Sequence, residues 1–158
     1  IEMEFAEVKT RPLFERIERL FKEHPSKPVF SISVGPGAES LHGDEEKLYR
    51  LFVNLAGNAL KYTPPGGAVT LAAEASGGDV ELSVRDQGPG VSKADQARLF
   101  EKFFRAGDAI TRKTPGTGLG LAICKGIVEA HHGSIRVESE PGRGARFVAR
   151  LPKKGPAA

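Results

Sequence analysis

Two asparagines, a lysine and a tyrosine lie at three- and four-residue steps in one short stretch: Asn54, Asn58, Lys61 and Tyr62. This spacing places their side chains close together on one face of a helix. An asparagine oxygen suits Mg²⁺, a lysine suits phosphate, and an aromatic ring can stack on a base. A solvated helix face would give the same pattern and is an equal alternative for this stretch alone, although asparagine is a mediocre helix former and two in mid-helix call for a reason.

The helix that must position these side chains begins near Asp44, which is a good N-cap residue. Its other face is apolar at the same kind of spacing, and this predicts burial against a core. The apolar residues are Leu48, Leu51, Phe52, Leu55 and Ala59. We therefore expect a long, half-buried helix that carries the polar side chains near its C-terminal end.

A second candidate site begins at Asp86, which ends a predicted strand and is followed by Gly88-Pro89-Gly90. A carboxylate there can accept a hydrogen bond from an exocyclic amine such as adenine N6. Gly88 and Gly90 have no Cβ, so a flat base could lie against their backbone. Taken alone, the motif is better explained as an ordinary turn with aspartate in its first position.

A third candidate site is a glycine-rich run that opens the last predicted helix. Free N–H groups at a helix N-terminus bind phosphate, but this run has the spacing of neither a Walker loop nor a full dinucleotide fingerprint. Flanking basic residues could reach a terminal phosphate, although a solvated loop is an alternative and is favoured for Lys113. The residues are Gly116, Thr117, Gly118, Leu119 and Gly120, flanked by Arg105, Arg112 and Lys113.

The composition narrows the class of protein. A chain of 158 residues with 39% hydrophobic and 27% charged residues is typical of one globular domain with a real core. The net charge of +3 comes from scattered basic residues without tryptophan or interleaved aromatics, so we expect no nucleic-acid partner and favour a phosphate-rich small ligand. The single cysteine, Cys124, excludes a disulfide framework. The four histidines show no ligand spacing, and we interpret them as structural or exposed.

Hydrophobic periodicity predicts three main helices and about five strands. The strands are expected near 29–34, 69–75, 80–86, 135–139 and 145–151, and the helices near 12–23, 44–62 and 116–131. Hairpins between strands suggest an α/β (α+β) two-layer sandwich, in which a mixed, mostly antiparallel sheet is covered on one face by helices. Residues 106–115 lack periodicity and predict a mobile loop.

The predicted domain covers residues 11–152, and residues 153–158 are expected to be a disordered tail. Residues 1–10 fit either a short first strand or the frayed end of a preceding helix. No stretch has the length and hydrophobicity of a membrane span or the pattern of a signal peptide. Because the first residue is Ile1, we expect a cytoplasmic piece of a longer protein, whose remainder could be anchored in the inner membrane.

Taken in order, four motifs resemble those of the ATP-binding catalytic domain of bacterial sensor histidine kinases, within the gyrase, chaperone and mismatch-repair ATPase superfamily. Residues 54–62 resemble the N box, 86–90 the G1 box, 100–105 the F box and 116–121 the G2 box. Each motif is modest alone, but four in order are highly specific. The resemblance implies a Bergerat fold with a mobile ATP lid, and ATP and Mg²⁺ as cofactors. His132 is a departure, because the family usually has glycine there.

The resemblance also implies a role for each matched residue. Asn58 would coordinate Mg²⁺ with Asn54 supporting it, and Lys61 would contact phosphate. Tyr62 would stack on adenine, whose amine Asp86 would bind. Gly88 and Gly90 would shape the base pocket, and Phe100 and Phe103 would anchor the lid. Arg105 and Arg112 would contact the γ-phosphate. The lid and its contacts with the phosphates would come from Gly116, Thr117, Gly118, Leu119 and Gly120.

Asn54 separates a kinase from a hydrolase. Related hydrolytic ATPases usually have a glutamate at this position as general base, and asparagine cannot take a proton. The implied nucleophile is then a histidine on a separate dimerisation domain, with a response regulator as the next partner, and the isolated chain is expected to be monomeric. The alternative is a nucleotide-binding interaction module that senses ATP or docks a partner without transfer.

Overall fold

The computed structural model describes residues 2–102, 104 and 120–156. Asp44 caps the central helix as predicted, since its side chain accepts a hydrogen bond from Lys47 N at 3.0 Å. The elements, in chain order, are β1 (Ala6–Lys9), α1 (Thr10–Leu20), β2 (Val29–Val34), β3 (Ser40–Gly43), α2 (Glu45–Tyr62), β4 (Ala68–Ser76), β5 (Asp79–Arg85), α3 (Lys93–Gln96), α5 (Gly120–Ala130), β6 (Ser134–Ser139) and β7 (Ala145–Pro152).

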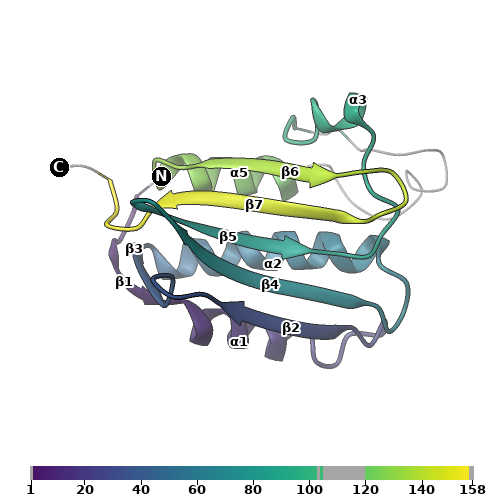
Figure 1. The fold of residues 1–158 in the computed structure, drawn as a ribbon, viewed down its shortest axis with the longest axis horizontal. Coiled ribbons are helices and arrows are strands. Elements are labelled where there is room, and N and C mark those ends of the chain that lie inside the picture. The colour runs from purple at the N-terminus through teal and green to yellow at the C-terminus, as the bar shows by residue number, and fades with distance from the viewer. Residues whose placement is uncertain (1, 103, 105–119, 157–158) are drawn as a thin grey trace.

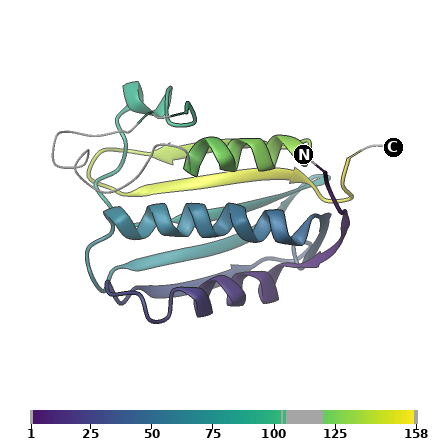
Figure 2. The same ribbon diagram turned by 180° about the vertical axis from the view of Figure 1, so that it is seen from behind.

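Five strands form the main sheet in the order β2-β4-β5-β7-β6, and β1 and β3 form a separate two-stranded sheet. Strands β2 and β4 are parallel, and the other three pairs of the main sheet are antiparallel. Helices α1, α2 and α5 lie side by side over one face of this sheet (Figures 1 and 2). The predicted two-layer α/β sandwich with a mixed, mostly antiparallel sheet is therefore confirmed.

Helix α2 is the centre of the helical layer, because its apolar face is buried in the core. Leu48, Leu51, Phe52 and Leu55 have no exposed surface, and the ring of Phe52 meets that of Phe14 in α1 edge-on, with centroids 5.0 Å apart. Burial of each such side chain stabilises the fold by about 1.5–3 kcal/mol. The packing fixes the rotation of α2 and hence the direction of its polar face.

The N-terminal end of α2 is held by a buried histidine from the end of α5. His131 Nε2 accepts a hydrogen bond from Asp44 N at 3.0 Å, and its Nδ1 lies 2.9 Å from the carbonyl oxygen of Ile127. Burial lowers the pKa of His131, in keeping with the structural role predicted for it. The next residue, His132, has φ 61, a left-handed conformation that favours the glycine usual in the family.

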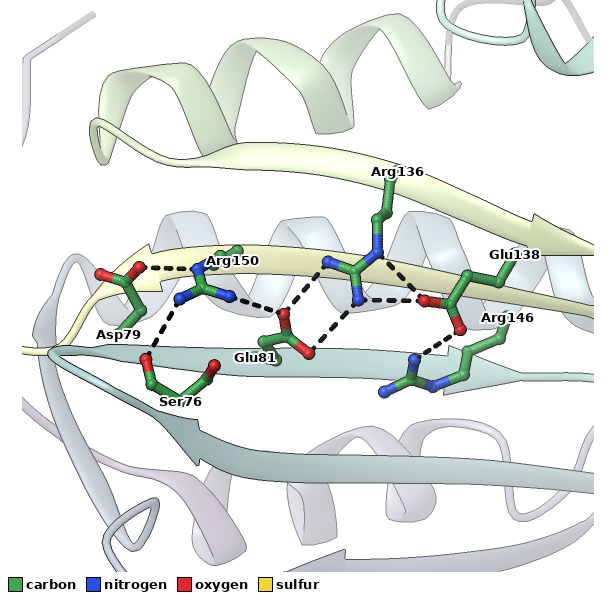
Figure 3. A network of polar contacts seen from close by, with 7 residues as sticks. All are labelled: Ser76, Asp79, Glu81, Arg136, Glu138, Arg146 and Arg150. Atoms are coloured by element: carbon green, nitrogen blue, oxygen red, sulfur yellow. Dashed lines mark hydrogen bonds and ion pairs between the residues drawn. The ribbon is translucent and has the colours of Figure 1, made fainter.

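The face of the sheet without helices carries a network of charged side chains on β5, β6 and β7 (Figure 3). Glu81 accepts hydrogen bonds from Arg136 at 3.1 and 3.3 Å and from Arg150 at 3.2 Å. Glu138 bonds with Arg136 and Arg146 at 3.1 and 2.8 Å. These charged groups are thus hydrogen-bonded to one another. Cross-strand pairs of opposite charge stabilise a sheet.

The two ends of the chain compare differently with the predictions. Of the two alternatives for residues 1–10, the structure has the strand, because β1 pairs with β3. Lys153 was expected in a disordered tail, but its backbone bonds with His42 at 2.8 Å and with Gly78 at 3.0 Å. That expectation is wrong for the start of the tail, because the exposed edge of β3 offers hydrogen bonds that a local sequence pattern does not reveal. No described helix is long and apolar enough to cross a membrane.

Candidate nucleotide-binding site

The C-terminal end of α2 lies against the loop that follows β5, which we call the base loop (residues 86–91). A Cβ built on Gly88 would lie 3.0 Å from Tyr62 Cβ. Gln87 N donates to Thr63 Oγ1 at 3.3 Å. The structure therefore brings the first and second candidate sites together, although they are separated by the β4–β5 hairpin in the sequence.

Asp86 lies at the start of the base loop with only 7% of its surface exposed. Its Oδ1 accepts hydrogen bonds from Gly88 N at 2.9 Å and Ala145 N at 3.0 Å. Its Oδ2 has no hydrogen-bond partner within the described residues. Burial raises the pKa of Asp86, and the two backbone hydrogen bonds oppose this shift. The arrangement fixes the carboxyl group and leaves one oxygen available to a ligand.

The two asparagines of α2 have different surroundings, although both are half-buried. Asn54 Nδ2 donates to Arg50 O, one turn earlier, at 3.0 Å. No described residue forms a hydrogen bond with the carboxamide of Asn58. Lys61, at the end of the helix, is exposed, and Tyr62 is half-buried. Asn58 and Lys61 thus present polar groups that are not hydrogen-bonded to any described residue.

The start of α5 completes the described part of the site. Gly120 is the first residue of α5, and a Cβ built on it would lie 3.2 Å from Asn54 Oδ1. Phe100 packs edge-on against Phe147, with ring centroids 6.3 Å apart. The other predicted residues of this region lie outside the described residues: Phe103, Arg105, Arg112, Lys113, Gly116, Thr117, Gly118 and Leu119.

Two residues for which no role in the site was predicted, Ser139 and Gln96, support the base loop. Ser139 Oγ accepts a hydrogen bond from Val91 N at 2.8 Å, and Gln96 Nε2 donates to Val91 O at 2.8 Å. Ser139 ends a predicted strand, and Gln96 ends α3; no contact with the base loop was predicted for either residue. The pairing of β7 with both β5 and β6 brings Ser139 to the loop, whereas Gln96 lies only five residues after Val91.

Within the described residues, no group of three or more histidine, cysteine, aspartate or glutamate side chains could hold a metal ion. Mg²⁺ in proteins usually takes one or two protein ligands together with oxygens from water and a bound molecule. A phosphate chain supplies such oxygens, which is the usual way in which Mg²⁺ is bound at nucleotide sites.

Comparison with known proteins supports this interpretation of the geometry. Residues 43–155 match the family of histidine kinase-, DNA gyrase B-, and HSP90-like ATPases. The sensor-like histidine kinase SenX3 of Mycolicibacterium smegmatis is 46% identical over 111 residues, which are 70% of this chain and 29% of SenX3. The sensor histidine kinase RcsC of Escherichia coli is 40% identical over 116 residues, 73% of this chain and 12% of RcsC.

Solved structures agree in fold and in class. Full-length ShkA in complex with AMPPNP superimposes with a TM-score of 0.83 at 35% identity, over 100% of this chain and 33% of that one. The mycobacterial sensor histidine kinase MprB gives a TM-score of 0.81 at 30% identity, over 97% of this chain and 100% of that one. The fold and the site thus define an ATP-binding domain.

The chain belongs to the family of histidine kinase-, DNA gyrase B-, and HSP90-like ATPases. Its similarity to SenX3 and MprB confirms the predicted resemblance to the ATP-binding catalytic domain of sensor histidine kinases. The chain spans less than a third of the length of SenX3 and RcsC.

Proposed function

We propose that the chain binds Mg·ATP between α2, the base loop and the start of α5, and transfers the γ-phosphoryl group to a histidine. That histidine belongs to a separate dimerisation and phosphoacceptor domain of the same protein, from which a response regulator receives the phosphoryl group. The observation that carries the proposal is Asp86, whose buried carboxyl group is fixed through one oxygen and available through the other.

Asp86 selects the base. The exocyclic amine of adenine donates a hydrogen bond to the available Asp86 oxygen, whereas guanine presents a carbonyl oxygen at the corresponding position, where two acceptors repel. Tyr62 stacks on the ring, and Gly88 and Gly90 leave room for it beside the backbone. The proximity of Gly88 to Tyr62 supports this arrangement.

Asn58 and Lys61 bind the phosphate end of the nucleotide. The carboxamide of Asn58, which has no hydrogen bond with a described residue, fits a hard cation, and Lys61 is exposed at the helix end. Bound Mg²⁺ would neutralise phosphate charge during transfer. The backbone N–H groups of residues 116–120 are proposed to contact the phosphates, and Arg105 and Arg112 the γ-phosphate.

Asn54 accounts for transfer rather than hydrolysis. Its carboxamide cannot accept a proton from water, and its nitrogen donates to Arg50 O. The chain therefore holds ATP until another nucleophile arrives, and positioning together with charge neutralisation carries the reaction. Its own His131 cannot serve as the phosphate acceptor, because it is 2% exposed and both ring nitrogens have partners.

The proposed partners rest on relatives. ThkA, a histidine kinase, has been solved in complex with the response regulator protein TrrA, and it superimposes on this chain with a TM-score of 0.78 at 26% identity. We propose a cytoplasmic location and a monomeric state for the domain by itself. Its boundaries at residues 11 and 152 remain predictions.

Phosphorylation of the full-length protein tests the proposal. Asn58→Ala should abolish transfer from labelled ATP to the acceptor histidine, because Mg²⁺ on the phosphate chain would lose the carboxamide oxygen proposed as its protein ligand. Glu45→Ala, an exposed position at the other end of α2, should transfer at the native rate. Unchanged transfer in Asn58→Ala, in a variant that melts like the native protein, would contradict the role of Asn58.

A further inference from the structure

Ser139, at the end of β6, joins two segments that are distant in the sequence. Its hydroxyl accepts a hydrogen bond from Val91 N in the base loop at 2.8 Å. The same hydroxyl donates to Gly144 O at 2.7 Å, at the end of the β6–β7 turn (residues 140–144). One half-buried side chain thus ties the base loop to this turn.

Two backbone–backbone hydrogen bonds and one to the Asp86 carboxyl group also connect the base loop with the turn and the start of β7. Gly142 N donates to Pro89 O at 2.6 Å, and Asp86 N donates to Ala145 O at 2.8 Å. Ala145 N returns a hydrogen bond to Asp86 Oδ1 at 3.0 Å. The β6–β7 turn therefore holds Pro89, and Ala145, the first residue of β7 directly after the turn, holds both the backbone and the carboxyl group of Asp86.

Gln96 in α3 closes the arrangement from the other side. Its Nε2 donates to Val91 O at 2.8 Å and to Ser139 O at 3.1 Å. One amide nitrogen thus bonds to a residue of the base loop and to a residue of β6. Gln96 and Ser139 thus hold the backbone on both sides of the Val91 Cα, Gln96 through the carbonyl oxygen of Val91 and Ser139 through its N–H.

Two glycines allow this close approach. Gly90 has φ 78 and Gly144 has φ 75, conformations that favour glycine. A Cβ on Gly90 would overlap the carbonyl oxygen of Glu140, and one on Gly144 would overlap that of Asp86. The base loop and the β6–β7 turn are therefore in direct backbone contact, so a shift of one moves the other.

We infer that Ser139 is a positioning residue for nucleobase recognition, which acts through Val91 and Gly144 to hold the Asp86 carboxyl group against the base. The inference rests on the proposed function of Asp86. A carboxyl group that can rotate accepts a hydrogen bond from the adenine amine less well, and it repels the carbonyl oxygen of guanine less strongly. Loss of the Ser139 hydroxyl should consequently weaken adenine binding and narrow the preference for adenine over guanine.

The test compares the affinities of the chain for ATP and GTP analogues in native, Ser139→Ala, Ser139→Thr and Ser134→Ala proteins. Ser134 is an exposed serine at the opposite end of the same strand. Ser139→Ala removes two hydrogen bonds. If the equivalent of one net hydrogen bond reaches Asp86, the adenine-to-guanine affinity ratio should fall about fivefold. Ser139→Thr, which keeps the hydroxyl, should restore the ratio toward the native value, and Ser134→Ala should leave it unchanged.

Amide hydrogen exchange, measured on the same proteins without nucleotide, tests directly whether the base loop is still held at Val91. Val91 N–H should lose protection in Ser139→Ala. Unchanged protection of Val91, or an unchanged affinity ratio once protection is lost, would overturn the inference. A native protein that shows no preference for adenine, or an Asp86→Asn variant with native affinity, would overturn the proposed function instead, and the two failures are thereby distinguished.

Discussion

Glu81, within β5, and Asp86, directly after that strand, are both carboxylic acids held by hydrogen bonds, but their partners differ in kind. Both oxygens of Glu81 receive arginine N–H groups at the open face of the sheet (Figure 3). Asp86 receives two backbone N–H groups through one oxygen only. A carboxylate with every acceptor in use stabilises the fold, whereas a fixed carboxylate with an acceptor to spare can bind a ligand.

The largest expected effect is on nucleotide affinity, which should depend on the carboxylate of Asp86 and not on that of Glu81. Asp86→Asn keeps an oxygen for the two backbone N–H groups but turns an NH₂ donor toward the amine of adenine. Because hydrogen bonds to charged groups contribute about 1.5–3 kcal/mol, affinity for an ATP analogue should fall at least about tenfold by calorimetry. Glu81→Gln is the matched control and should bind like the native protein. Equal losses in both variants would remove the distinction.

A smaller effect concerns stability. Arg136→Ala removes hydrogen bonds to both Glu81 and Glu138, but the arginine side chain is 44% exposed, so solvent screens the ion pairs. We expect a loss of about 0.5–1 kcal/mol in the free energy of unfolding, measured with urea, that shrinks at high salt. Nucleotide affinity should not change. A large loss of affinity would mean that the open face contributes to the site.

The pH dependence of stability should have opposite signs for the two groups. Hydrogen bonding to Arg136 lowers the pKa of Glu81, so its stabilising effect is present above its ordinary pKa and is lost as the pH falls through the lowered value. Burial raises the pKa of Asp86, so its charged form costs stability above that raised value, and the cost disappears as the pH falls below its ordinary pKa.

Urea unfolding between about pH 3 and 6 measures both effects. The native advantage over Glu81→Gln should grow as the pH rises, and the native advantage over Asp86→Asn should shrink. The informative quantity is how the stability difference between native and variant changes with pH, since either substitution can also change stability by an amount that does not depend on pH. Slopes of the same sign would contradict the contrast between the two sites.

The smallest expected effect concerns a buried ionisable group that is not part of the site. Cys124 has no exposed surface, its Sγ lies 3.8 Å from Leu51 O, and burial raises the pKa of its thiol to about 12. Iodoacetamide at about pH 8 should leave it unmodified in the native protein and label it once the chain is unfolded in urea. Labelling of the native chain at the rate of a free thiol would show that the α2–α5 interface opens.

The sequence was informative where a pattern is local. The spacing of Leu48, Leu51 and Leu55 predicts the buried face of α2, and the same helix then carries Asn54 and Asn58 on a polar face. The meeting of Tyr62 with Gly88 depends on sheet pairing, and the four ordered motifs indicated it only through the resemblance. No role in the site was predicted for Ser139 or Gln96, because the contacts that join Ser139 to Val91 and to Gln96 link segments that are distant in the sequence.

Calorimetric titration with a non-hydrolysable ATP analogue, in Mg²⁺ and in EDTA, tests most directly the claim that α2 and the base loop form one Mg·ATP pocket. The native chain should bind with a dissociation constant on the order of micromolar, more tightly with Mg²⁺, whereas Asn58→Ala should gain little from the metal. The account would be contradicted if the native chain bound equally tightly with and without Mg²⁺ or did not bind at all. It would also be contradicted if Mg²⁺ increased the affinity of Asn58→Ala as much as that of the native chain.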